Sequence, residues 1–373
     1  MSDRIAPPRI LLRLEAEIAG ARSQLEADCK RAERAVYLAR MGEGDEAQAE
    51  VDDLQRRYCS SPNARVSAWL HLVLGVIAHF KDMDPTARDS LLRAHALSGA
   101  AGLTRLRALS AAWLAHIDYL RLNLRSMVGC ATEALRLAGD EDHSTRSRVS
   151  LVVAQAYHLG GRLDTALAWY TLARNHASSE GDEATLSALM HNMAWLRAQE
   201  LRIRAWIQTE VVRDEGYARL GAESVANFDA MIGVKGLSSL LPVLRAQIRV
   251  ALGEFGDALG LLEVNLEAAV REGMGRLKAD LMADIAWCRV NLGQSEAAKR
   301  DAVAAEALID PAGQFDDRAM AHGRLAQVFA ALGEVDDAAR HKRLALDAFT
   351  EHEALKTDML RLLCDSPETH LDR

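Results

Sequence analysis

The chain has 373 residues, of which 49% are hydrophobic and only 5% aromatic, and its formal charge at pH 7 is −8. This composition suffices for a packed interior and favours closely packed helices over a β-rich fold. The negative balance opposes nucleic-acid binding, which needs a concentrated basic face, so we expect no nucleic acid among the partners. An arginine cluster, Arg197, Arg202 and Arg204, is interpreted as a solvated helix face rather than a phosphate site.

The sequence shows no sign of secretion or of a membrane span. The N-terminus lacks the apolar core of a signal peptide. The longest apolar run, 72–78, is far shorter than the ~20 residues that cross a bilayer. The five cysteines are widely spaced and form neither a disulfide framework nor a zinc pattern. We therefore expect a soluble protein of the reducing cytoplasm.

In chain order, the first expected element is 10–40, interpreted as one helix or as a cap helix that runs into a first repeat. A short segment of Leu or Met, then Gly, a polar turn and Ala, recurs after it. Clear copies occupy 41–47, 159–166, 252–258, 292–298 and 332–338, and fainter ones lie at 81–87 and near Leu122 and Leu201. Most steps between copies are near 40 residues. Such a period is typical of stacked helical hairpins.

The recurring segment has a physical reason in such a hairpin. The first helix must end sharply, and Gly accepts the left-handed conformation that stops it. An Asp or Ser shortly afterwards caps the next helix. The Ala five residues after the Gly is expected where two helices approach closely, because a larger side chain would push them apart.

Three units repeat small and aromatic residues at fixed offsets from this turn. They carry Val153, Ala154, Tyr157, Ala166, Tyr170 and Ala173 in 147–178, Ala246, Gly253, Ala258 and Leu262 in 240–270, and Leu325, Ala326, Phe329, Gly333, Ala338 and Ala345 in 319–348. Over roughly 28–350 the chain resembles the tetratricopeptide repeat (TPR) family, in the longer repeat form typical of sensor solenoids in bacterial signalling proteins. The resemblance implies an all-α fold, a right-handed superhelix of about eight antiparallel helix pairs with capping helices at both ends.

Two breaks in the period indicate the domain organisation. Residues 211–236 exceed one period and are rich in glycine, which predicts an irregular insertion or hinge. A final helix within 346–363 is expected to cover the last repeat, followed by a loose polar tail from 364 to 373. The expected domains are a capping helix in 1–27, repeats in 28–210, the insertion in 211–236, repeats in 237–350, and the cap end with the tail in 351–373.

The sequence carries no recognisable catalytic constellation. His-Glu-x-x-His, Gly-x-Ser-x-Gly and phosphate-loop motifs are absent, and the twelve histidines show no metal-ligand spacing. We expect no cofactor, no metal and no enzymatic activity. An enzyme with a site inside the superhelix is the less favoured alternative, with Asp280, Asp284, His191 and Arg148 as its candidate residues.

In solenoids of this kind the first helix of each pair lines a concave groove and the second lies outside. When the groove positions of the family are transferred to this sequence, the resemblance implies twelve groove residues: His79, Tyr119, Arg148, Gln155, His158, His191, Trp195, Gln247, Asp280, Trp287, Asn291 and Gln327. These residue types make binding hot spots. Gln155, Asn291 and Gln327 favour the groove because buried amides need partners. For Trp195 and Trp287, a position wedged between neighbouring repeats is an equal alternative.

The leading functional hypothesis is a non-enzymatic adaptor or regulatory sensor in bacterial signalling that holds a protein segment or peptide in the groove. Each unit touches only its neighbours, so small angular shifts on binding add along the stack. The alternative is the sensory half of a larger signalling protein, such as a diguanylate cyclase or a transcription regulator, that binds a small effector. Homo-oligomeric scaffolding through the outer helices or 211–236 is compatible with the leading hypothesis.

Overall fold

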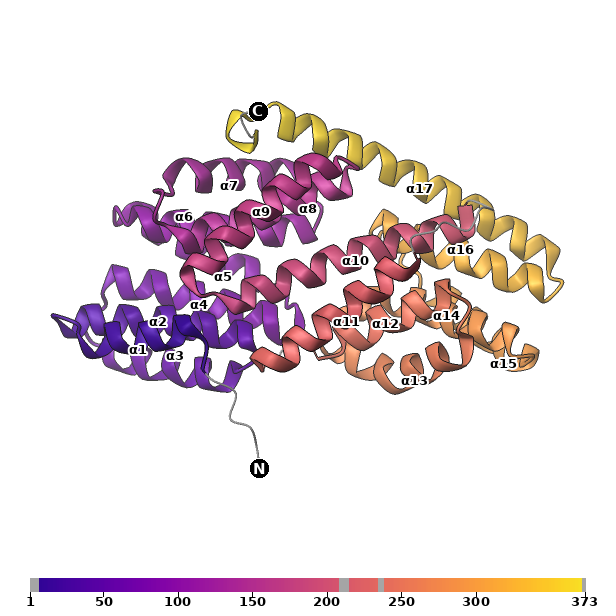
Figure 1. The fold of residues 1–373 in the computed structure, drawn as a ribbon, viewed down its shortest axis with the longest axis horizontal. Helices are drawn as coiled ribbons and strands as arrows, with labels where there is room; N and C mark the ends of the chain where they lie inside the picture. The colour runs from indigo at the N-terminus through magenta and orange to yellow at the C-terminus, as the bar shows by residue number, and fades with distance from the viewer. Residues whose placement is uncertain (1–6, 208–214, 234–237, 371–373) are drawn as a thin grey trace. The chain divides into compact units, whose positions relative to one another are not determined.

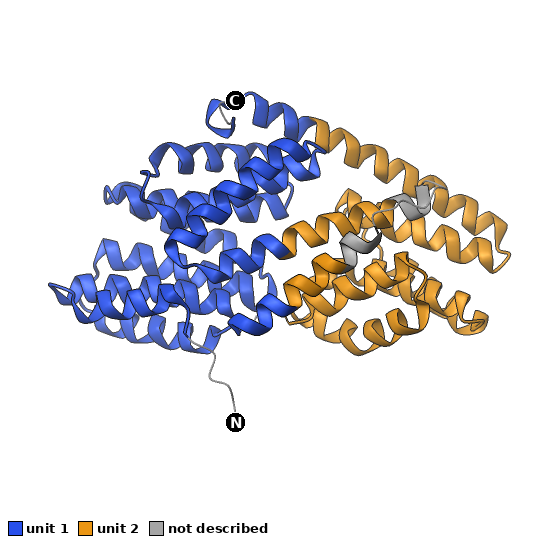
Figure 2. Ribbon diagram, in the orientation of Figure 1, with its two compact units in different colours: residues 1–190, 227–236, 358–373 blue, residues 191–226, 237–357 orange. Residues whose placement is uncertain are grey.

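The computed structural model describes residues 7–207, 215–233 and 238–370, and the side chains of 204–219 lie outside this description. The described residues form 17 α-helices and two short 3-10 helices, and none of them forms a strand (Figure 1). The all-α prediction is confirmed. The helices belong to two compact units: 1–190, 227–236 and 358–373 make unit 1, and 191–226 and 237–357 make unit 2 (Figure 2).

Unit 1 begins with a separate helix and continues as four helix pairs. After α1 (Arg9–Ala19) come α2 (Gln24–Met41) with α3 (Gly44–Tyr58), α4 (Ala64–Asp82) with α5 (Ala87–Ala100), α6 (Thr104–Leu120) with α7 (Leu124–Leu137), and α8 (His143–Leu159) with α9 (Leu163–Glu180). The unit also contains the start of α10 (Glu183–Ile207), the end of α11 (Glu215–Ile232), the end of α17 (Val335–Cys364) and η2 (Pro367–Thr369). One apolar core runs from α2 to α6 through adjacent pairs.

Unit 2 contains the remaining parts of α10, α11 and α17 and the helices between the last two. These are α12 (Leu240–Ala251) with α13 (Phe255–Arg271), then η1 (Met274–Leu277), α14 (Lys278–Asn291) with α15 (Ser295–Ala307), and α16 (Phe315–Ala331), which leads into α17. A core cluster that includes Ala283, Ala302 and Phe329 joins α14, α15 and α16. Both units are thus stacks of helical hairpins, the solenoid architecture that the repeat predicts.

The turn glycines adopt the expected left-handed conformation. Gly253, Gly293 and Gly333 have φ of 78°, 75° and 80°. In two of the three faint copies the same conformation falls on Met83 and Leu122, with φ of 53° and 56°. The left-handed conformation costs a non-glycine residue about 1–2 kcal/mol of free energy. The packing of the hairpins therefore overrides local backbone preference at these two turns.

Small residues keep paired helices close, as the sequence predicts. Ala47, Ala166 and Ala298, each five residues after a turn glycine, are fully buried. In α4, Gly75 lies so close to α5 that a Cβ added there would meet the side chain of Leu91 at 2.7 Å. A side chain at position 75 would force the pair apart.

The helix ends differ from the sequence expectation in two places. No turn occurs near Leu201, because α10 continues unbroken for 25 residues and contains neither Gly nor Pro. Of the two interpretations of 10–40, the structure has a separate helix and then the first repeat, since α1 ends at Ala19 and α2 begins at Gln24. Within 211–236 the structure describes α11 from Glu215. Residues 211–214 and 234–236 lie outside the described residues, so the hinge there stays a prediction.

The tail is not loose as far as residue 370. The last cap is part of one 30-residue helix, α17, which also serves as the second helix of the final repeat. Beyond it, Thr369 is fully buried and its hydroxyl donates to the Leu363 carbonyl at 2.6 Å. The Tyr157 hydroxyl of α8 donates to the Thr369 carbonyl at 3.2 Å. These bonds anchor the C-terminal segment on unit 1.

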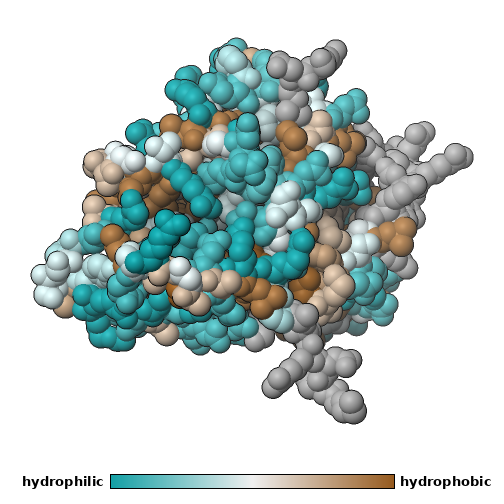
Figure 3. All heavy atoms as spheres, turned by 60° about the vertical axis from the view of Figure 1, so that its left-hand side comes forward, coloured by the Kyte–Doolittle hydropathy of each residue, from teal (hydrophilic) through white to brown (hydrophobic). Residues whose placement is uncertain are grey.

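The described surface is predominantly polar on the face drawn in Figure 3. Hydrophilic side chains cover most of that face, and hydrophobic ones appear in separate patches between them. Among the described helices, none combines the length and the apolar character that crossing a bilayer requires.

Candidate functional site

The first helices of unit 1 converge on one interior surface around a cavity of about 30 Å³. The lining comes from α1, α2, α4, α6, α8 and the N-terminus of α10, and the second helices α3, α5, α7 and α9 contribute no described lining residue. We call this surface the inner wall of unit 1. It consists of Ile10, Glu33, Val36, Tyr37, Arg40, Trp69, Leu109, Trp113, Ser144, Arg148, Asp182 and Thr185. The cavity holds no more than a water molecule or two, so the chain's own side chains fill the wall.

An ion pair on the inner wall joins α2 to the N-terminus of α10. Arg40 of α2 donates to the two carboxylate oxygens of Asp182 at 2.8 and 2.9 Å, and to the Thr185 hydroxyl at 2.6 Å. Asp182 also caps α10, because it accepts the backbone N–H of Thr185 at 2.9 Å. Burial acts to raise the pKa of Asp182, but Arg40 and these hydrogen bonds outweigh it and hold the pKa below its usual value.

Arg148 of α8 is the second cation of the inner wall, and no acidic group pairs with it. The residue is 3% exposed, and its Cζ lies 4.1 Å from the ring centre of Trp113, within cation–π range. Among the described residues, none forms a hydrogen bond or ion pair with the guanidinium, although the charge of Asp182 attracts it. Burial, followed by the charge of Arg40, lowers the pKa of Arg148 to about 9. The group therefore remains mostly charged at neutral pH.

Two histidines lie behind Trp113 and contact each other. The Nε2 atoms of His79 and His116 are 3.3 Å apart, and the His116 ring meets Trp113 edge to face at 5.8 Å. Burial, and then the charge of Arg148, lower the pKa of His79 to about 4. Burial also lowers the pKa of His116 well below its usual value. Both rings are neutral at pH 7 and support the wall by packing.

Unit 2 contains a separate buried network of charges. Arg202 of α10 is fully buried, and its Nη2 donates to both oxygens of Asp280 at 2.7 and 2.8 Å and to Asp284 at 2.9 Å. Arg324 of α16 donates to Asp284 at 2.7 Å, and Gln247 donates to Asp280 at 3.3 Å. We call these five residues the unit 2 ion network. The interpretation of Arg202 as part of a solvated face is wrong, because α14 supplies two carboxylates one turn apart to receive it.

The network gives little support to the enzyme alternative. Burial raises the pKa of Asp280, and burial also raises the pKa of the nearby Asp317 to about 7. Asp280 is bound by Arg202, however, and Asp317 is bound by Arg276. Each shifted carboxyl thus already has an arginine partner within unit 2. The described residues contain no group of three His, Cys, Asp or Glu that could hold a metal ion.

Of the predicted groove residues of unit 1, the structure brings His79 and Arg148 together around Trp113. Gln155 and His158 are each 4% exposed, and the His158 ring contacts the Tyr170 hydroxyl at 3.2 Å. Tyr119 is also buried. A ligand cannot reach these three residues in the described conformation, because their side chains pack inside the helix layers. Their role in binding stays a prediction.

In unit 2, the predicted groove residues Gln247 and Asp280 belong to the ion network. Gln327 lies next to this network and accepts a hydrogen bond from Arg324 at 2.7 Å. Trp287 is half-buried between two neighbouring repeats. Its ring meets Phe255 edge to face at 6.3 Å, and the guanidinium of Arg324 lies 5.7 Å from its centre. These contacts favour the wedged alternative for this tryptophan.

Three further predicted residues of unit 2 remain partly accessible. Asn291 is exposed, and its side chain donates to the Trp287 carbonyl at 2.8 Å. His191 and Trp195 are half-buried and stack on each other with ring centres 6.3 Å apart. Burial lowers the pKa of His191 to about 4. None of the three is joined to the ion network by a described contact.

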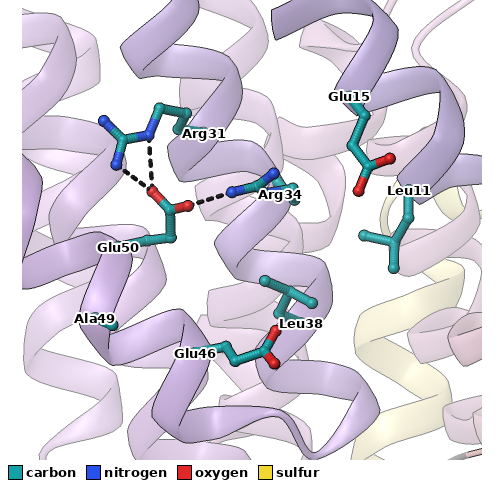
Figure 4. Close-up of a pocket in the computed structure, with 8 residues that line it drawn as sticks. All are labelled: Leu11, Glu15, Arg31, Arg34, Leu38, Glu46, Ala49 and Glu50. Carbon is teal, nitrogen blue, oxygen red and sulfur yellow. Dashed lines mark hydrogen bonds and ion pairs between the residues drawn. The ribbon is translucent and has the colours of Figure 1, made fainter.

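A wider surface pocket of about 500 Å³ lies between α1, α2 and α3 (Figure 4). Arg31 and Arg34 of α2 point toward Glu50 of α3 and form ion pairs with it. Glu15 of α1 and Glu46 of α3 complete the polar lining. Because Glu50 already engages both arginines, this pocket lacks the unpaired cation that distinguishes the inner wall.

Comparisons with known proteins bear on the fold. No model of a known protein family matches the chain, and no curated protein sequence matches it. Among solved structures, the chain is similar to a Rap protein in the "Crystal Structure of Rap Protein Complexed with Competence and Sporulation Factor", with a TM-score of 0.57. The match covers 88% of this chain and 99% of that chain at 11% sequence identity. At this identity the likeness shows a shared helical-repeat fold.

Proposed function

We propose that the protein is a non-enzymatic regulatory binding protein that holds a peptide or protein segment on the inner wall of unit 1. The observation that carries this proposal is the composition of the wall. Successive first helices place Tyr37, Trp69, Trp113, Arg40 and Arg148 on one surface. Tryptophan, tyrosine and arginine dominate binding hot spots, because they combine large contact areas with directed hydrogen bonds.

Three further observations support a peptide as the ligand. The fold resembles that of a Rap protein whose crystal structure contains Competence and Sporulation Factor. The repeat resemblance points to the TPR family, whose members bind peptides and protein segments on the inner surface. The formal charge of −8 also favours such a partner over nucleic acid. We place this activity in bacterial cytoplasmic signalling, as an adaptor or sensor.

The wall must open for a peptide to enter, because the present cavity is far smaller than one residue. The helix α1 covers it: Ile10 lines the cavity, and Ile10 and Leu14 pack with Tyr37 and Met41 of α2. Binding is thus coupled to a rearrangement of α1 or of neighbouring helices. Such a coupling is what a regulator needs, since a ligand shifts a conformational equilibrium only by binding one state better than the other.

The test is a binding screen with the full-length chain and a pool of fluorescent peptides of five to eight residues. Trp69 is half-buried on the wall and also packs against the core of unit 1, so Trp69→Phe, which keeps an aromatic contact with that core, is tested beside Trp69→Ala, and Trp69→Ala is expected to weaken the best peptide at least ~10-fold. Leu167→Ala, an exposed apolar change on the outer helix α9, is the matched control and should bind normally. If Trp69→Ala and Leu167→Ala bind every peptide equally well, the inner wall is not the site.

A further inference from the structure

We propose that Arg148 is a carboxylate-binding residue that receives an acidic group of the ligand on the inner wall of unit 1. This inference rests on the proposed function and specifies the chemistry of the ligand. The acidic group is either a side-chain carboxylate or the C-terminal carboxylate of a peptide. Both present the same pair of oxygens to a guanidinium.

The argument starts from the charges that surround Arg148. A charged side chain that is 3% exposed has lost nearly all its water, and proteins normally compensate such a group with a counter-charge. The inner wall offers two carboxylates, and both are engaged elsewhere. Asp182 attracts Arg148 through its charge, but its carboxylate oxygens are hydrogen-bonded to Arg40 and Thr185 and form no described ion pair with Arg148. Glu33 forms ion pairs with two cations outside the cavity lining, Lys30 at 2.8 Å and Arg105 at 3.3 Å.

The geometry leaves the guanidinium available. Its Cζ lies 4.1 Å from the centre of the Trp113 ring, and its N–H groups make no hydrogen bond to a described residue. An arginine held in this way is preorganised for two parallel hydrogen bonds to a carboxylate. Arg148 also borders the cavity, so its unpartnered side chain faces the space from which a ligand arrives.

The same cavity explains why the site is closed in the described conformation. Ile10 of α1 is one of its lining residues. Polar contacts hold α1 there, since Arg13 pairs with Glu180 at 2.6 Å and Arg9 donates to the Ser178 carbonyl at 2.7 Å. A carboxylate that reaches Arg148 needs more space than this cavity of about 30 Å³ offers, and a displacement of α1 with Ile10 would supply it. Weakening α1 is therefore expected to strengthen carboxylate binding.

The experiment measures the melting temperature of the full-length chain in formate or acetate, at constant ionic strength against sodium chloride. In the wild type each carboxylate is expected to raise the melting temperature. At ten times its Kd the unfolding constant should fall about tenfold. Arg148→Met removes the buried charge and keeps an apolar contact with Trp113. This variant should melt at or above the wild-type temperature and lose the response to carboxylates. Arg148→Lys should keep a weaker response, and Arg174→Met, on the exposed face of α9, should keep the full response.

The following outcomes decide the proposal. Equal responses of the wild type and Arg148→Met overturn it, as does a wild type that does not respond even when Arg13→Ala loosens α1. With the best peptide of the screen, a loss of affinity on C-terminal amidation identifies the terminal carboxylate, and a loss on Glu→Gln or Asp→Asn exchange identifies a side chain. A peptide that binds Arg148→Met as tightly as the wild type refutes the role of Arg148 but leaves the proposed function standing. A wild type that responds to formate but binds no peptide refutes the proposed function and leaves Arg148 as an anion site.

Discussion

The unit 2 ion network gives the sharpest stability prediction. In Arg202→Met, Asp284 keeps its hydrogen bond from Arg324, but Asp280 keeps only the long one from Gln247 at 3.3 Å. An uncompensated carboxylate then remains in the interior. Removing one partner of a buried ion pair costs about 3–5 kcal/mol. Because whole domains are stable by only ~5–15 kcal/mol, we expect the variant to retain a small margin of stability.

The measurement is urea unfolding followed by circular dichroism, with hydrogen exchange of α14 to localise the loss. Arg197→Met is the matched control, because Arg197 is an exposed arginine on the same helix, and its substitution should change stability by less than ~0.5 kcal/mol. The double variant Arg202→Met with Asp280→Asn is expected to recover much of the loss, since the amide carries no charge.

The dependence on pH provides a second check of the same reasoning. Burial raises the folded-state pKa of Asp280 above its unfolded value, and without Arg202 that pKa rises further. A carboxyl with a raised folded-state pKa binds its proton more tightly in the folded state, so the variant should gain stability relative to the wild type as the pH falls. A loss for Arg202→Met below about 1 kcal/mol, or equal to that of Arg197→Met, would refute the network as a stabilising feature.

Two further predictions concern unit 1. Gly75→Ala should destabilise the chain by about 1–3 kcal/mol, because the new Cβ meets Leu91 at 2.7 Å. Gly129→Ala lies in an open position of α7 and should stabilise the chain by about 0.5–1 kcal/mol. Thermal melts of both variants check these two effects. His79 has a pKa near 4 in the folded state, against 6.5 for the free side chain, so it stays neutral in the folded chain while the unfolded chain takes up a proton. This residue should therefore lower the free energy of unfolding by about 3 kcal/mol between pH 6.5 and 4. Urea titrations at each pH check this, and His79→Gln should flatten the decline. A flat wild-type profile in that range would contradict the assignment.

The regular part of the fold follows from local sequence signals. A glycine followed five residues later by alanine recurs at a fixed period, and the structure places a left-handed residue and a close helix contact at those positions. The same logic failed near Leu201, because a faint copy of the segment cannot end a helix that lacks Gly and Pro. It also missed Met83 as a left-handed residue, since that conformation is imposed by the packing of the pair.

The candidate site was less predictable than the fold. Position along the repeat identified Arg148, but gave no sign that the residue is buried against Trp113. The pairing of Arg40 with Asp182 joins residues 142 positions apart, and no local motif encodes it. The burial of Arg202 could not be predicted for the same reason, because it depends on two carboxylates supplied by α14. The role of a buried charged residue depends on its counter-charge, and the tertiary fold brings that counter-charge from a distant part of the sequence.

Because α1 must move before a ligand binds, this helix sets the ligand concentration at which the protein responds, whereas other residues determine which ligand it binds. Burial of Ile10 and Leu14 is worth about 3–6 kcal/mol, so an open form would make up roughly one molecule in two hundred to one in twenty-five thousand. Apparent affinity falls by the same factor, which sets a concentration threshold for the response. Substitutions along this helix would move that threshold up or down while the ligand-contacting residues, and hence selectivity, stay unchanged.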